Sequence, residues 1–212
     1  MTTYPLEDFI AKVNFESVYD HYTARIDARN TILTLFKKAI TIEDKKYLAE
    51  YILSIHNLHA NYSAHRYGGG KIILSSNPNA HHRLLLFVNS LMTSEEKELI
   101  KRIKECGMLN LAISIGSEIA CILRPDYWWV TNRRTVWAKT LVDTGNSDMA
   151  YELIRMYQQE VKYTLHPDVK LGLIKLMSYI KEDNLPKDLN QYFYLFADCV
   201  ANDLYIQYVD DD

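Results

Sequence analysis

The sequence has few of the residues that interrupt or cross-link a chain. Its 212 residues include only 7 glycines, 5 prolines and 3 cysteines. So little glycine and proline excludes a collagen-like or low-complexity chain, and a hydrophobic content of 48% excludes disorder over most of the length. Because Cys106, Cys121 and Cys199 are odd in number and far apart, we expect neither a disulfide framework nor a zinc site built on paired cysteines.

A strong charge of one sign and a long hydrophobic run are also missing. The 24 basic and 27 acidic residues give a net charge of -3, so the whole chain offers no strong attraction for nucleic acid or anionic lipid. The most apolar stretch, residues 108–123, is shorter than the ~20 residues that span a bilayer. The N-terminus lacks the basic start and apolar segment of a secretory signal. We therefore expect a cytoplasmic protein with no membrane segment.

Helical periodicity dominates what is present. Near the C-terminus one apolar stripe follows helical spacing and includes Leu189, Tyr192, Phe193, Phe196, Val200 and Leu204. Thr41 with Asp44 is typical of a helix start, and Gly107 and Gly145 are typical of helix ends. Helices joined by short turns predict an all-α fold, either an antiparallel bundle or a short helix-pair solenoid, in a single domain over residues 1–212.

Residues 68–79 interrupt this pattern. Three consecutive glycines precede the β-favouring residues 71–74, and turn-forming residues follow. The segment predicts a flexible loop or a short β-arm at 71–75, and any weak subdivision of the domain is expected here. Gly69 and Lys71 are candidate binding residues on this loop. A nucleotide-binding P-loop is disfavoured because Ile72, and no Ser or Thr, follows the lysine.

Residues 124–137 combine all the tryptophans of the chain with three arginines. Aromatic and arginine side chains are enriched at the energetic centres of interfaces. The candidate binding residues are Tyr127, Trp128, Trp129, Arg133, Arg134 and Trp137. The competing interpretation is that at least one tryptophan belongs to the core.

The histidines are clustered, which raises the possibility of a metal site. His56 and His59 are three residues apart in a helix expected to run to about Tyr62 or His65, and His81 could reach them as a third ligand. Such a site would bind a transition metal such as zinc. The alternative is a hydrogen-bonded His59 in the core, His56 at its boundary and His81 in solvent, with no cofactor.

Glu118 is the one carboxylate in the most hydrophobic stretch. A buried carboxylate needs a partner, and Arg124, Arg133 and Arg134 are the candidates.

These features favour a non-catalytic, cytosolic protein-binding module, such as a bacterial toxin-immunity or adaptor protein. No G-x-S-x-G motif is present, and 16 tyrosines supply rigid contact area with polar tips. One alternative is a metal-dependent hydrolase that uses the histidines, and another is a single-stranded nucleic-acid binder that uses the Trp/Arg segment. The expected partner is another protein, with a homodimer left open.

Overall fold

The computed structural model describes residues 5–156 and 161–209, and within these ranges the chain is helical without any strand. The all-α fold predicted from the sequence is confirmed. The described residues form α1 (Leu6–Ile10), α2 (Phe15–Lys38), α3 (Ile42–Ile52), α4 (Tyr62–His65), α5 (Gly69–Ser76), α6 (Ala80–Thr93), α7 (Leu99–Cys106), α8 (Ile113–Leu123), α9 (Arg133–Thr144), α10 (Ser147–Met156), α11 (His166–Met177) and α12 (Leu189–Tyr208).

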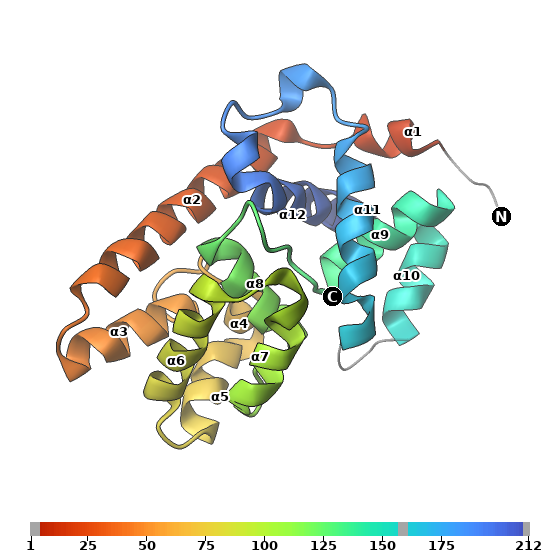
Figure 1. Ribbon diagram of the computed structural model, residues 1–212. Helices are drawn as coiled ribbons and strands as arrows, with labels where there is room; N and C mark the ends of the chain where they lie inside the picture. Colours follow the sequence, from red (N-terminus) through yellow and green to blue (C-terminus); the bar gives the residue numbers. More distant parts are fainter. Residues whose placement is uncertain (1–4, 157–160, 210–212) are drawn as a thin grey trace.

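The helices gather in two groups, which Figure 1 shows at the lower left and at the upper right. Helices α3 to α8 form the first group, in which α6 packs against α3, α7 and α8. Helices α9 to α12 form the second, in which α9 packs against α10, α11 and α12. The long helix α2 contacts α3 and α8 on one side and α12 on the other. The junction of the two groups is therefore made by α2, α8, α9 and α12.

Capping interactions explain where several helices begin and end. The side chain of Asn14 accepts a hydrogen bond from the Ser17 amide at the start of α2. Thr41 and Asp44 bond each other's backbone amides at the start of α3, as the sequence predicts. Gly107 and Gly145, with φ of 59° and 61°, end α7 and α9 in the left-handed conformation that glycine adopts without strain.

Residues 69–76 form a helix, so the predicted loop or β-arm at 71–75 is wrong. Helix α5 follows Gly68, whose φ is 68°, and buries Gly70 and Ile73 against its neighbours. A Cβ atom on Gly70 would lie 2.2 Å from the backbone oxygen of Leu53, so only glycine allows this close approach. Tertiary packing here overrides the β preference of the isoleucines.

Helix α3 ends at Ile52, about ten residues before the predicted end. Ser54 has a φ of 56°, which a continuing helix cannot accommodate. The chain resumes its helical course at α4, where the side chain of Asn61 accepts a hydrogen bond from the Ala64 amide. His56 and His59 therefore lie on an irregular segment and do not share the face of a helix.

Nowhere in residues 5–156 and 161–209 is a helix both long and apolar enough to cross a membrane.

Candidate functional site

A pocket of about 110 Å³ lies at the junction of the two helix groups, and we call it the Arg25 pocket. Five parts of the chain line it: α2, the segment before α4, the start of α4, α9 and α12. Its residues are His21, Arg25, Leu58, His59, Tyr62, Arg134, Asp198, Cys199, Asn202 and Ile206.

Helical spacing brings these side chains to one place. His21 and Arg25 are four residues apart on α2, and Asp198, Asn202 and Ile206 are successively four apart on α12. Because α2 and α12 pack side by side, the two rows face the same pocket. His59 comes from the irregular segment, where its ring centroid lies 5.9 Å from that of His21.

The floor of the Arg25 pocket is an ion pair between Arg25 and Asp198. Both side chains are buried, with residue exposures of 8% and 1%. Burial is the largest single influence and lowers the pKa of Arg25, but Asp198, together with Cys199, Cys121 and Glu118, more than offsets it, so the pKa lies above its ordinary value. The guanidinium is therefore charged at every relevant pH.

His59 and Cys199 add neutral groups to the same pocket. Partial burial, then the proximity of His21 and of Arg25, lowers the pKa of His59 below its ordinary value of 6.5. Burial raises the pKa of the Cys199 thiol to about 12, although Arg25 acts in the opposite direction. At neutral pH the imidazole of His59 is therefore unprotonated and the thiol of Cys199 is protonated.

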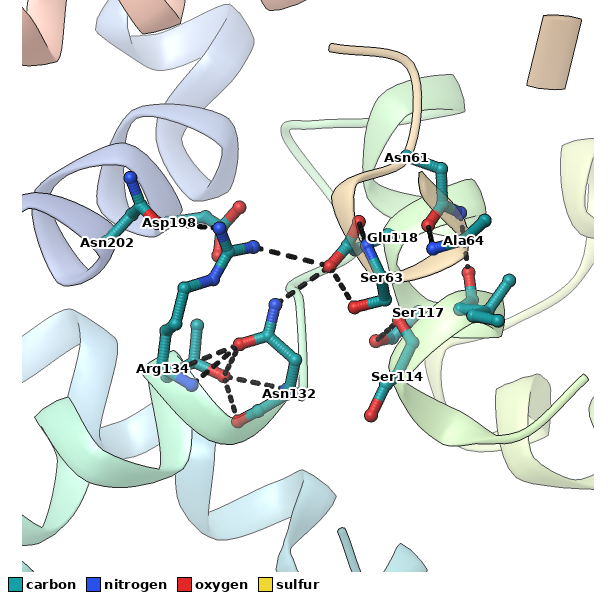
Figure 2. A network of polar contacts seen from close by, with 12 residues as sticks. Asn61, Ser63, Ala64, Ser114, Ser117, Glu118, Asn132, Arg134, Asp198 and Asn202 are labelled. Carbon is teal, nitrogen blue, oxygen red and sulfur yellow. Dashed lines mark hydrogen bonds and ion pairs between the residues drawn. The ribbon is translucent and has the colours of Figure 1, made fainter. Parts of the chain in front are cut away.

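Arg134 forms one wall of the pocket, with its guanidinium carbon 4.0 Å from the centre of the Tyr62 ring. One terminal nitrogen donates to Oδ1 of Asn202 at 2.6 Å, and the other lies 3.4 Å from Oε1 of Glu118. Figure 2 shows Arg134 reaching from α9 between the α12 residues and Glu118 on α8. The expected pairing of Glu118 with an arginine is confirmed, and the partner is Arg134.

Glu118 connects α4, α8 and α9 through hydrogen bonds (Figure 2). Its Oε1 accepts from the Ser63 hydroxyl at 2.6 Å and from Nδ2 of Asn132 at 2.8 Å, and its Oε2 accepts from the Ser63 amide at 3.1 Å. Asn132 also caps α9 through the amides of Arg134 and Thr135. Since Glu118 is fully buried, this network fixes the positions of both Tyr62 and Arg134.

A second pocket of about 160 Å³ shares Tyr62 and Arg134 with the first, and we call it the Arg133 pocket. Its residues are Tyr62, Ser63, Arg66, Ser114, Asn132, Arg133 and Arg134. The Nε atom of Arg133 is buried there without a hydrogen-bond partner. Together the two pockets are lined by Arg25, Arg66, Arg133 and Arg134, and both include Tyr62.

The structure separates the arginines of the predicted Trp/Arg surface from its tryptophans. Arg133 and Arg134 line pockets, whereas Trp128, Trp129 and Trp137 are 0%, 2% and 0% exposed. The prediction of an exposed tryptophan surface is wrong, because these large apolar rings fill the core between helices.

The aromatic residues of this segment make contacts with other residues of the chain. Trp129 stacks on the ring of His166 at 4.3 Å and donates from Nε1 to its backbone oxygen at 2.7 Å. Trp137 packs against Tyr205 and Tyr208 of α12. The Tyr127 hydroxyl accepts a hydrogen bond from the Glu96 amide at 2.7 Å, away from both pockets.

Gly69 and Lys71 begin α5 and line neither arginine pocket. Gly69 is half-buried and Lys71 is exposed. Their proposed part in binding stays a prediction.

The three candidate metal ligands do not converge. Nε2 of His56 and of His81 lie 3.0 Å and 3.7 Å from the carboxylate of Glu50, while His59 faces His21 in the Arg25 pocket. Within the described parts of the chain, no group of three His, Cys, Asp or Glu side chains is placed to hold a metal ion. The predicted His56/His59/His81 site is wrong because the helix expected to carry two of them ends before either.

Sequence reasoning did not identify Arg25, Asp198 or Tyr62. A signal was available for Asp198, which interrupts the apolar residues 194–201 as Glu118 interrupts its own apolar stretch. Arg25 lies on the inner side of α2, one turn after the buried Tyr22. Nothing in the sequence places Tyr62 beside Arg134, because that contact joins residues 72 positions apart.

Comparison with protein-family models, with curated proteins and with solved structures finds no match to this chain. The geometry of the pockets is therefore what bears on function.

Proposed function

We propose that the protein is a non-catalytic binding module that captures another protein at the two arginine pockets. One observation carries the proposal, the stacked Tyr62–Arg134 pair that lines both pockets. Tyrosine and arginine, with tryptophan, are enriched at the energetic centres of protein interfaces, where surrounding contacts exclude water.

The surroundings of the pair have the composition of such a centre. Leu58, Tyr62 and Ile206 line the Arg25 pocket and are 44%, 39% and 50% exposed. Burying these side chains against a partner would remove apolar surface from water, at roughly 25 cal/mol for each Å². Arginine donors beneath that rim would give the contact its specificity. Toxin-immunity and adaptor proteins of the cytoplasm are examples of this class of module.

The test is capture of a partner by the whole chain purified from the cells that express it. Tyr62→Ala should reduce the amount of the dominant co-purified protein by roughly 30-fold, as loss of a hot spot of about 2 kcal/mol would. Tyr151→Ala is the matched control, because Tyr151 is also 39% exposed and also lies beside an arginine, Arg155, at 5.8 Å.

Two results would contradict the proposal. One is a chain that elutes alone, and the other is equal capture by the Tyr62 and Tyr151 variants. A captured nucleic acid with affinity that falls steeply as salt rises would instead support the nucleic-acid alternative.

A further inference from the structure

The Arg133 pocket contains hydrogen-bond donors that are both accessible and unused. The side chain of Arg133 makes no hydrogen bond or ion pair with the other described residues, and its terminal nitrogens, Nη1 and Nη2, are not closed off from solvent as Nε is. The hydroxyl of Ser114, at the start of α8, is also accessible and has no partner in the described part of the chain. Two lining residues can therefore donate to a ligand without giving up an existing contact.

The charges around the Arg133 pocket favour an anion. Arg66, Arg133 and Arg134 line it, and none of its described lining residues is acidic. Glu118 offsets the charge of Arg134 from its buried position 3.4 Å away, whereas Arg133 has no acidic partner among the described residues. The Arg25 pocket differs, because Asp198 is part of its lining. An anion with two negative charges gains more from these surroundings than one with a single charge.

The type and number of the free donors suit a phosphate group. The terminal nitrogens of an arginine form a fork that two phosphate oxygens accept at once. The hydroxyl of Ser114 can donate to a third oxygen, which a carboxylate does not have. Helix α8 adds to this, because Ala112 provides no side-chain cap for the amides of its first turn, where Ser114 lies.

From these donors and charges we infer that the Arg133 pocket binds a phosphate group, held by Nη1 and Nη2 of Arg133 and by the hydroxyl of Ser114. The source of that phosphate rests on the proposed function: a phosphorylated side chain of the captured protein. Tyr62 lines both pockets, so such a residue would lie beside the apolar rim of the Arg25 pocket. The net charge of -3 makes a nucleic-acid backbone the less favoured source.

The first experiment uses the whole wild-type chain, with inorganic phosphate as the probe. Backbone amide NMR spectra are recorded during a phosphate titration at about pH 7.5, where phosphate is largely doubly charged, with chloride added to keep the ionic strength constant. The amide signals of Ser114 and Arg133 should shift and reach saturation. Acetate, with a single charge and two oxygens, should bind about tenfold more weakly or less.

Single variants test the two donors. Arg133→Gln should weaken phosphate binding about tenfold or more, and its circular dichroism spectrum should match the wild type because the replaced side chain has no polar contact to lose. Ser114→Ala should weaken it about threefold. The matched control is Arg155→Gln, which removes the same charge from a side chain that is 53% exposed and lies outside the pocket. This control should bind phosphate as the wild type does.

Three results would overturn the assignment. They are wild-type affinity for phosphate in a folded Arg133→Gln variant, equal weakening by Arg133→Gln and Arg155→Gln, and binding of acetate as tight as that of phosphate. The second result would indicate attraction by the surface charge as a whole.

A peptide experiment tests the source of the phosphate. Acetyl-Ala-phosphoserine-Ala-amide should bind at least as tightly as inorganic phosphate, and the unphosphorylated peptide should not bind. Binding of phosphate without binding of the phosphopeptide would contradict the protein source, as would tighter binding of a short oligothymidine that Arg133→Gln abolishes. A chain that binds phosphate but captures no partner would contradict the proposed function alone, whereas capture of a partner by a chain that does not bind phosphate would contradict this inference alone.

Discussion

Replacing Glu118 with glutamine should destabilise the fold strongly, because the carboxylate connects α4, α8 and α9. Glutamine has almost the same volume, so no cavity forms and only the polar interactions change. Its oxygen can replace Oε1, which accepts from Ser63 and Asn132 and pairs with Arg134. Its NH2 group then faces the Ser63 amide, which has donated to Oε2 at 3.1 Å. Two donors therefore oppose each other in a buried place.

The buried ion pair with Arg134 sets the magnitude of the destabilisation. Loss of one partner from a buried ion pair costs roughly 3–5 kcal/mol, because the other charge stays buried and uncompensated. Arg134 keeps its bond to Asn202 and its stack on Tyr62, so we expect the lower end of that range. The expected loss in the free energy of unfolding is about 3 kcal/mol, a large share of the roughly 5–15 kcal/mol that stabilises a typical protein.

Urea denaturation followed by tryptophan fluorescence measures this loss, because the three tryptophans are buried. The matched control is Glu152→Gln, which breaks the pair between Glu152 and Arg155 at 2.9 Å. Those side chains are 64% and 53% exposed, so the control should lose less than about 1 kcal/mol. Similar losses for the two variants would refute the reasoning that burial makes the Glu118 network important.

Two further predictions concern pH and packing. Burial, and then Lys170, lowers the pKa of His166 to about 4 from 6.5. Between these two pH values the unfolded chain therefore binds a proton at this histidine that the folded chain does not bind. The free energy of unfolding falls as the pH drops from about 6.5 to about 4, by up to roughly 3 kcal/mol. The denaturation midpoint should fall less between pH 7 and pH 4.5 for His166→Gln than for the wild type. An equal fall in the two proteins would contradict His166 as the cause. Gly70→Ala places a Cβ atom 2.2 Å from the Leu53 oxygen and should cost roughly 1–3 kcal/mol, which a thermal melt matching the wild type would disprove.

Local signals predicted most of the helices because they act over a few residues. The reciprocal bonds of Thr41 and Asp44, and the left-handed glycines at 107 and 145, depend only on neighbouring residues. The failures at residues 53–61 and 71–75 have another cause. Gly70 of α5 lies against the backbone of Leu53, just after the end of α3, and no local pattern contains this contact between the two segments.

The candidate site was only partly predictable, because a composition does not say which side chains face inward. Arg133 and Arg134 line pockets, whereas Trp137, a few residues later on the same helix, is in the core. At about 100° per residue Trp137 projects between the two arginines, so helical spacing does not separate them. Contacts from other elements do, because Trp137 packs against Tyr205 and Tyr208 of α12 while Arg134 stacks on Tyr62 of α4. Arginine and tryptophan in the same segment therefore do not indicate that both belong to one surface.

The buried charges at the junction of the helices are difficult to explain by stability alone. Replacing a buried ion pair with well-packed apolar side chains is often neutral or stabilising. Arg25 and Asp198 lie among residues such as Phe196 and Leu195 that already form an apolar core, and three of their polar atoms have no partner. A core built only for stability would have no need of these atoms. Replacing either residue alone would leave the other charge buried and uncompensated, so Arg25 and Asp198 are expected to tolerate replacement only as a pair.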